Sequence, residues 1–219
     1  MTLKKYTQLA SILIIIATVY YSFYTLTPSK NYIATNKTEF STEKALVHLK
    51  AITKQAHYTG SSEHTIVRNY IVNELENLGL EVEIQEQVAV NKKWGAAAKT
   101  QNILARIKGS ENGKAILLLS HYDSNPHSSL GASDAASGVV VILEGIRAFL
   151  AKNEVPKNDI IICISDAEEL GLLGANAFVN HHSWAKDVAL VLNFEARGSG
   201  GPSYLLLETN GGNKNLIEA

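Results

Sequence analysis

The chain has 219 residues, of which 46% are hydrophobic and 19% are charged, a composition typical of folded proteins and not of disordered ones. Its formal net charge is −1 and it carries no basic stripe, so electrostatics give no support for nucleic-acid binding. Its single cysteine, Cys163, excludes an intramolecular disulfide. Within the apolar run DIIICIS this residue is expected to be a small buried hydrophobe.

The N-terminal region has the composition of a membrane-spanning segment. No charged residue occurs between Lys5 and Lys30, and the stretch LASILIIIATVYYSFYTL within that span is long enough to cross a bilayer. Tyrosines gather toward its far end, where an aromatic belt would lie. A cleaved signal peptide needs a shorter core and a small-x-small cleavage site, and a soluble core helix usually shows a polar face. The sequence therefore favours a retained anchor.

The flanking charges predict an orientation for this anchor. Lys4 and Lys5 precede it, which favours a cytoplasmic N-terminus and a following domain in the periplasm, the cell exterior or an organelle lumen. We therefore expect a cytoplasmic stub and single transmembrane anchor over residues 1–30, a polar linker over 31–40, and a folded domain over 41–219. The sequence predicts no oligomeric state.

Hydrophobic periodicity predicts the elements of the folded domain. The expected helices are 41–56, 61–80, 136–153 and 170–182, and a further helix begins within NGGNKNLIEA. The expected strands are 81–90, 100–109, 115–121, 159–167, 188–198 and 203–209. Three of them, AILLLSH, DIIICISDA and VALVLNFEARG, are continuously apolar at their starts, which is typical of strands buried on both faces. The alternation of strands and helices predicts an α/β sheet with helices on both faces.

Polar side chains follow each of these three apolar strands. They are His121 and Asp123 after the first, Asp166, Glu168 and Glu169 after the second, and Glu195 after the third. Ligands of open α/β sheets bind outside the carboxyl ends of the strands. The sequence therefore predicts that several acidic residues and one histidine converge at one edge, and a bound cation is a physical reason for that convergence.

Two segments around the first apolar strand carry candidate ligands. In extended backbone His121 and Asp123 point the same way, so the carboxylate can fix the imidazole tautomer and leave the other nitrogen for a metal. The alternative is a hydrogen-bonded structural histidine. Asp134, within GASDAASG before a helix, is either an ordinary N-cap or a carboxylate that bridges two cations.

The adjacent carboxylates Glu168 and Glu169 are the strongest local signal, because they repel each other at the end of an apolar strand. One can ligate a metal while the other faces the metal-bound water as general base. The alternative is a solvated pair that starts the next helix. For Glu195 the alternative is a polar strand end.

The remaining histidines and the usual catalytic motifs give no competing site. His127 lies in a loop between the motif residues and is assigned no catalytic role. Surface roles are expected for the histidines on or beside helices, His48, His57, His64, His181 and His182. The sequence contains no H-E-x-x-H, no G-x-S-x-G and no G-x-x-x-x-G-K, so a serine hydrolase or a P-loop enzyme is unsupported.

The segments LLLSHYDS, GASDAASGVVVILE, DAEELGLLGA and LNFEARGSGG, in this order, resemble the M28 family of zinc exopeptidases. They are most similar to its membrane-anchored branch, the vacuolar membrane protease and endoplasmic reticulum metallopeptidase group. TGSSEHTIVRNYIVNELENLGL adds weaker support, and the resemblance covers about residues 41–219. It implies a three-layer fold with a mixed central sheet between helices, peptide substrates, two zinc ions and removal of residues from peptide N-termini.

The resemblance also implies roles for individual residues. The implied zinc ligands are His121, Asp134, Glu169 and Glu195. Asp134 would bridge the two ions, whereas His121 and Glu195 would each be a terminal ligand on one side or the other. Glu168 would be the general base, and Asp123 would orient His121.

Two departures from the family pattern stand in this sequence. Many members have Asp where this chain has Glu195, and the pattern ends with a further histidine ligand, whereas no histidine follows Glu195. We therefore expect the chain to be a fragment of a longer peptidase. Two other functions stay open: a single-zinc acyltransferase similar to glutaminyl cyclases, and a non-catalytic binding ectodomain like that of transferrin receptors.

Overall fold

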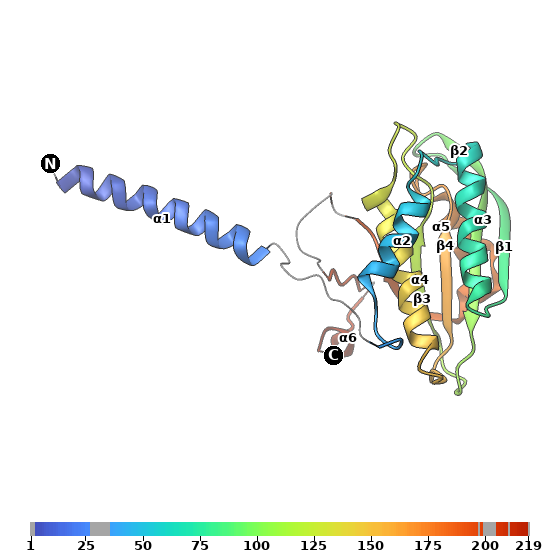
Figure 1. Ribbon diagram of the computed structural model, residues 1–219. Helices are drawn as coiled ribbons and strands as arrows, with labels where there is room; N and C mark the ends of the chain where they lie inside the picture. Colours follow the sequence, from blue (N-terminus) through green and yellow to red (C-terminus); the bar gives the residue numbers. More distant parts are fainter. Residues whose placement is uncertain (1–2, 27–35, 197, 199–204, 210, 219) are drawn as a thin grey trace. The chain divides into compact units, whose positions relative to one another are not determined.

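The computed structural model describes residues 3–26, 36–196, 198, 205–209 and 211–218 (Figure 1). The described residues of the range 31–198 form one compact unit. Those of the ranges 1–30 and 199–219 group separately from it. Every side chain considered below as part of the candidate site belongs to the first of these units.

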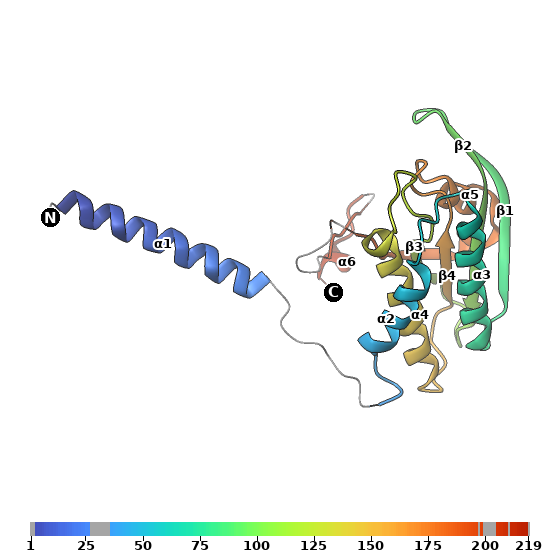
Figure 2. The same cartoon turned by 45° about the horizontal axis from the view of Figure 1, so that its top comes forward.

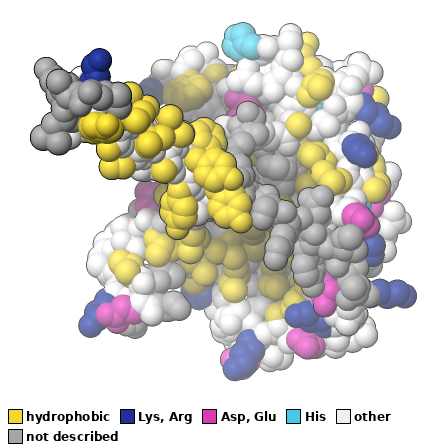
Figure 3. All heavy atoms as spheres, turned by 60° about the vertical axis from the view of Figure 1, so that its left-hand side comes forward, with side chains coloured by type: hydrophobic (Ala, Val, Ile, Leu, Met, Phe, Trp, Pro, Cys, Tyr) yellow, Lys and Arg dark blue, Asp and Glu magenta, His cyan; other side chains and the backbone are white. Residues whose placement is uncertain are grey.

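The N-terminal helix α1 (Leu3–Leu26) has the length and polarity of a membrane span. Its window Lys5–Thr25 covers 21 residues with a mean hydropathy of 1.4, and none of it is buried. At 1.5 Å per residue the window is about 32 Å long, close to the ~30 Å of a bilayer core. Figure 3 shows hydrophobic side chains over its visible surface. The described helix is thus a candidate span, and the anchor and its orientation stay predictions.

The folded unit is built on a five-stranded mixed sheet. Its strands are β1 (Val82–Asn91), β2 (Ala96–Ile107), β3 (Ala115–His121), β4 (Ile160–Ser165) and β5 (Val188–Asn193). Their order across the sheet is β1-β2-β4-β3-β5. The pairs β1–β2 and β2–β4 are antiparallel, whereas β3 runs parallel to both β4 and β5. The predicted α/β sheet is confirmed.

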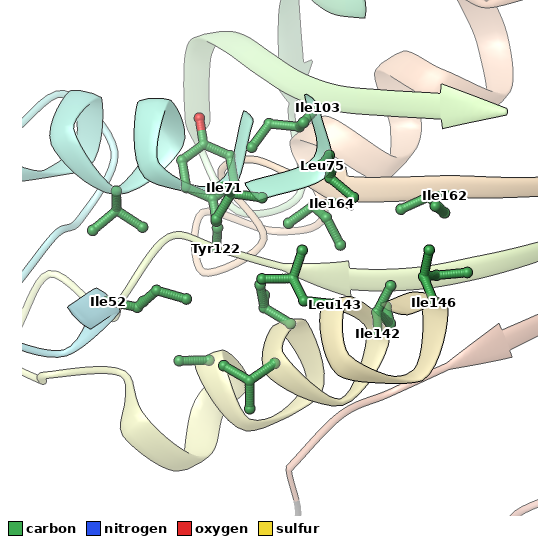
Figure 4. Packing of buried hydrophobic residues seen from close by; sticks show 14 of the residues in the cluster. Ile52, Ile71, Leu75, Ile103, Tyr122, Ile142, Leu143, Ile146, Ile162 and Ile164 are labelled. Atoms are coloured by element: carbon green, nitrogen blue, oxygen red, sulfur yellow. The ribbon is translucent and has the colours of Figure 1, made fainter. Parts of the chain in front are cut away.

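Helices cover both faces of this sheet (Figure 1). They are α2 (Thr42–Ile52), α3 (Ser62–Asn77), α4 (Ser137–Leu150) and α5 (Leu173–His181). Successive side chains of β4 point to opposite faces of the sheet. Ile162 and Ile164 pack with residues of α2, α3 and α4 (Figure 4). Ile161 and Cys163 pack on the other face with Phe178 of α5. Because both faces are covered, the strand is continuously apolar, and the predicted burial of Cys163 is confirmed.

A buried carboxylate joins the start of α2 to α4. Glu144 of α4 has no exposed surface; one of its oxygens accepts the Ser41 amide at 2.8 Å, and Arg147 forms an ion pair with it. Arg147 also donates to the carbonyl oxygens of Lys37 and Glu39. The segment that precedes α2 is therefore fixed to α4 through hydrogen bonds of its backbone groups.

The strand predicted at 203–209 is wrong for the part that the structure describes. Residues 205–209 form no strand, and Leu205 is 81% exposed. An apolar run becomes a strand only where a neighbour supplies hydrogen bonds and a face on which to pack, and no pairing with this segment occurs among the described residues. The expected C-terminal helix is present as α6 (Lys214–Glu218).

Charged residues cluster at the amino end of β4. Asp159 accepts hydrogen bonds from Arg106 Nε at 2.6 Å, Lys108 Nζ at 2.9 Å and the Gly109 amide at 2.7 Å. Arg106 also pairs with Asp187 at 2.7 Å, in the short 3-10 helix Ser183–Asp187 that precedes β5. This network links the ends of β2, β4 and β5 on the side of the sheet opposite the polar strand ends.

Asp159→Asn is expected to lower the free energy of unfolding at pH 7 by about 1–3 kcal/mol, because hydrogen bonds to a charged group are lost. The Gly109 amide, Lys108 and Arg106 hold the pKa of Asp159 well below its ordinary value. A lowered pKa adds stability above the unfolded value of about 4, and that stability is lost as the pH falls below it. Denaturant titrations should therefore show the difference between wild type and variant shrinking from pH 7 to pH 2.

Asp187→Asn is the matched control for this prediction, since it removes the more exposed carboxylate from the same arginine. It should change the free energy of unfolding by less than about 1 kcal/mol. Equal losses in the two variants, or a loss for Asp159→Asn that does not depend on pH, would contradict the assignment.

Candidate metal centre

The parallel strands β3, β4 and β5 end at the same edge of the sheet. His121 is the last residue of β3 and pairs with Ser165, the last residue of β4. Beyond the strands, the Tyr122 amide donates to Ser165 O at 3.0 Å and the Phe194 amide donates to Leu119 O at 2.8 Å. The segments that follow the three strands are therefore held side by side at this edge.

The imidazole of His121 lies at the centre of the polar groups on this edge. The residue is 1% exposed, and its Nδ1 lies 3.0 Å from Asp123 O and 3.3 Å from Asp123 Oδ1. Its Nε2 lies 3.0 Å from Asp134 Oδ1, 3.6 Å from Glu195 Oε2 and 3.8 Å from Glu168 Oε2. A ring nitrogen that donates to Asp123 leaves Nε2 facing three carboxylates, which is the geometry of a histidine ligand.

Three of the predicted ligands form one compact group. One ligand atom each from His121, Asp134 and Glu195 lie within 4.8 Å of one another. One imidazole and two carboxylates are suitable donors for zinc and for several other divalent cations. The structure thus brings His121 and Glu195 close to one carboxylate, that of Asp134.

Asp134 is not the N-cap of α4, because it lies two residues before Ala136, the residue that precedes the helix. It lies in a short irregular turn, Ala132–Ala136, with φ −111° and ψ 100°, and α4 begins only at Ser137. The residue before α4, Ala136, makes no side-chain cap. The Asp134 carboxylate is about half exposed and faces His121, so it is available to a cation.

Glu168 and Glu169 lie in the turn between β4 and α5. The alternative that they start the helix is wrong, because α5 begins at Leu173. Both oxygens of Asp123 are used here: Oδ1 accepts the Glu168 amide at 3.0 Å and Oδ2 accepts the Glu169 amide at 3.1 Å. One buried carboxylate therefore holds the turn and also lies against the His121 ring.

Glu169 lies outside the three-residue group. Its Oε2 accepts a hydrogen bond from Asn125 Nδ2 at 2.8 Å, and Asn125 Oδ1 in turn accepts the His127 amide at 3.1 Å. Asn125 is not among the site residues predicted from the sequence. The sign of it in the sequence is an amide side chain in the loop that follows His121 and Asp123.

The charges of the site are poorly balanced by protein groups. Burial lowers the pKa of His121, but hydrogen bonds with Asp123 and Glu195 outweigh it and raise the pKa to about 11. Burial, with repulsion from Glu195 and Asp123, raises the pKa of Glu168 to about 7 against the attraction of His121. Burial also raises the pKa of Asp134. Several carboxylates thus share one imidazolium, an arrangement that a divalent cation would neutralise.

The surface roles expected for two histidines are wrong. His57 is 1% exposed and His64 is 4% exposed. The ring of His57 contacts Gln55 O through Nδ1, and that of His64 contacts Asp166 through Nε2. Their positions beside a helix start suggested exposure, but in the first turn of α3 His64 is buried against Asp166, whereas Ser62 and Thr65 are exposed.

Other histidines are closer to the expectation. His181 and His127 are exposed, and the half-buried His48 contacts the Tyr70 hydroxyl at 2.7 Å. His182 differs from the expected surface role, because its side chain is only 8% exposed and lies 3.2 Å from Glu83. None of these four belongs to the three-residue group found among the described residues.

The sequence is similar to a known family and to curated proteins. The family model described as Peptidase family M28 matches residues 102–219. The "Vacuolar membrane protease" of Yarrowia lipolytica is 34% identical over 184 residues, covering 74% of this chain and 18% of that protein. The "Putative endoplasmic reticulum metallopeptidase 1-B" of Caenorhabditis elegans is 30% identical over 191 residues, covering 77% and 21%. The chain therefore spans about a fifth of the length of these relatives.

Solved structures share the fold. A leucine aminopeptidase precursor from Bacteroides thetaiotaomicron matches with a TM-score of 0.61 and 26% identity, over 73% of this chain and 63% of that one. A glutaminyl cyclase from the same organism matches with a TM-score of 0.61 and 25% identity, over 72% and 62%. The arrangement of the sheet and its helices is thus common to a leucine aminopeptidase precursor and to a glutaminyl cyclase.

Gly138, at the start of α4, determines how closely the Glu195 segment approaches His121. A Cβ atom at this glycine would overlap the Phe194 carbonyl oxygen and the Ser120 hydroxyl. Phe194 precedes Glu195 and Ser120 precedes His121. A side chain at position 138 would therefore separate the two segments that carry these ligands.

Gly138→Ala is expected to destabilise the fold by about 1–3 kcal/mol and to weaken zinc binding, because backbone atoms must move to admit the methyl group. Gly145→Ala in the same helix is the control, since nothing lies within 4 Å of a Cβ there. That substitution should stabilise the helix by about 0.5–1 kcal/mol. Thermal unfolding and zinc titration of both variants measure the effects, and similar behaviour of the two would contradict the close packing.

Proposed function

Because the chain belongs to peptidase family M28, we propose that it is a zinc-dependent aminopeptidase that removes N-terminal residues from peptides. The observation that carries this proposal is the group formed by His121, Asp134 and Glu195, with Glu168 directly beside it. The group lies at the carboxyl edge of the sheet, where ligands of such folds bind. The similarity to a leucine aminopeptidase precursor supports the reaction class.

The donor set fits zinc. His121 offers Nε2 while its Nδ1 is held by Asp123, and this second contact is typical of zinc-bound histidines. We propose that His121, Asp134 and Glu195 hold one zinc ion. Asp134, whose carboxylate is half exposed, would be shared with a second ion that Glu169 also ligates.

Glu168 is the proposed general base. Zinc, when bound, lowers the pKa of water and polarises the carbonyl group of the scissile peptide bond. The Glu168 carboxylate is half buried, and its backbone is fixed by Asp123, so it can accept a proton from water beside the ligand group. The hydroxide formed from this water would attack the carbonyl carbon of the scissile peptide bond, and the same carboxyl group would return the proton to the amine nitrogen as the C–N bond breaks.

We further propose that the peptidase is anchored to a membrane by α1, with its catalytic domain on the extracytoplasmic side. The support is the apolar window Lys5–Thr25 and the printed names of the curated relatives. The substrates would then be peptides on that side of the membrane.

A second candidate is a glutaminyl cyclase-like acyltransferase that uses one zinc ion. Two observations favour it: the similarity to a glutaminyl cyclase structure, and a compact ligand group that comprises three residues and does not include Glu169. The two functions differ in zinc stoichiometry and in the product formed from a peptide with an N-terminal glutamine.

Glu168→Gln is expected to lower kcat for peptide hydrolysis by about 10²–10⁴-fold, because the proton acceptor is lost. Zinc content should be unchanged, since Glu168 is not a proposed ligand. Glu76→Gln, at an exposed position of α3, is the control and should leave kcat unchanged. Full activity in the Glu168→Gln protein would rule out the proposed mechanism.

Zinc stoichiometry separates the two candidate functions. Elemental analysis of the full-length protein is expected to give two zinc ions per chain, and removal by a chelator should abolish hydrolysis until zinc is restored. One zinc ion per chain, together with release of ammonia from a peptide with N-terminal glutamine, would replace the aminopeptidase by the cyclase.

A further inference from the structure

A buried pair of ionisable side chains lies next to the candidate metal centre without belonging to it. His64, in the first turn of α3, is 4% exposed, and Asp166, directly after β4, has no exposed surface. The His64 Nε2 and Asp166 Oδ1 atoms are 2.7 Å apart. The proposed hydrolysis uses neither side chain, so the pair needs another explanation.

Asp166 fixes the point where the catalytic turn leaves the sheet. Its Oδ1 also accepts the Thr59 hydroxyl at 3.1 Å, and its Oδ2 accepts the Gln101 amide at 2.8 Å. Its own amide donates to Asn102 Oδ1 at 3.0 Å, and its carbonyl oxygen accepts the Gly174 amide at 2.9 Å. The start of α3, strand β2 and the first turn of α5 are thus joined through one residue.

The residue between Asp166 and Glu168 shows why the turn needs this support. Ala167 has φ 54°, a left-handed conformation that costs about 1–2 kcal/mol for a residue with a Cβ. Such a conformation persists only where its neighbours determine it. Asp166 does so from one side, and the bond between Asp123 and the Glu168 amide does so from the other.

The same pair supports the residue after His121. The Tyr122 ring stacks on the His64 ring with centroids 4.6 Å apart and an angle of 19°. The Tyr122 hydroxyl donates to Gln101 O at 3.1 Å, beside the amide that binds Asp166. The segment that carries His121 and the turn that carries Glu168 therefore rest on one buried pair.

We propose that His64 and Asp166 are positioning residues that hold Glu168 and His121 in their mutual orientation for catalysis; this rests on the proposed peptidase function. Stability alone gives no reason for the pair, because burying ionisable groups carries a desolvation penalty that an apolar pair of similar volume avoids. What the pair adds is orientation, because its hydrogen bonds involve atoms that determine the backbone path of the turn that carries Glu168.

His64→Ala is expected to lower kcat by about 100-fold, the scale of a 1 Å misplacement, and to change KM by less than about threefold. His64→Gln places an amide donor near the position of Nε2 and should recover kcat to within about fivefold of wild type. His48→Ala is the matched control, since it removes a half-buried ring that hydrogen-bonds Tyr70 away from the turn. It should leave kcat unchanged.

Hydrogen exchange gives a readout that does not depend on activity. Amides of residues 168–172 should exchange at least about tenfold faster in His64→Ala than in His48→Ala, because the turn opens more often. If wild type shows no zinc-dependent hydrolysis, the proposed function fails, and this exchange comparison alone decides the positioning role. Equal exchange and equal kcat in the two variants would overturn the inference.

Thr59→Val covers the case in which His64→Ala does not fold. It removes one donor to Asp166 at nearly constant volume, and Thr53→Val, which removes a hydroxyl bonded to Leu49 O, is its control. Thr59→Val should lower kcat several-fold and speed exchange at residues 168–172. A Thr59→Val protein that matches Thr53→Val in both measurements would also overturn the inference.

Discussion

The parallel pairing of β3 with β4 and β5 is the constraint on which the candidate site depends. It places the ends of three strands at one edge, so that His121 and the segments carrying Glu168 and Glu195 meet although they are far apart in sequence. Asp123 adds the finer adjustment, because its carboxylate binds the amides of the turn and lies against the His121 ring. Movement of any one strand end would therefore disturb several ligands at once.

The two edges of the sheet differ in how their carboxylates are balanced. At the amino edge Asp159 has Arg106, Lys108 and a backbone amide as partners, and its pKa is held low. At the carboxyl edge Asp134, Glu168 and Glu195 all form ion pairs with the same residue, His121. Burial there raises the pKa of Glu168 and Asp134. One edge is neutralised by the protein itself, and the other has the charge of a site completed by a cation.

Strand-end residues could be predicted from the sequence because three apolar runs, in β3, β4 and β5, are each followed by polar residues. The runs alone were not decisive for burial: β5 lies at the edge of the sheet and is largely exposed, and the apolar run at 205–207 forms no strand. Helix faces were harder. In α3 the apolar residue Ile66 is 59% exposed, whereas the polar residue His64 is buried on the same face as Val67, Ile71 and Leu75. The spacing of buried positions is regular, but position 64 carries a polar residue whose partner, Asp166, is distant in sequence. Periodicity in residue type cannot reveal such a partner, and the same limit hid Asn125 beside Glu169.

The two parts of the proposed metal centre are held in place by different kinds of interaction. His121 and Glu195 are placed by the pairing of β3 with β4 and β5 and by the close contact of Gly138 with the Phe194 segment, and Asp134 lies in the turn before α4. Glu169 is held by the side chain of a loop residue, Asn125. A ligand group fixed by the sheet loses little conformational entropy when a cation binds, whereas one held by a loop side chain must exchange a hydrogen bond for each ligand bond. We therefore expect a cation to bind more tightly among His121, Asp134 and Glu195 than at a position that includes Glu169.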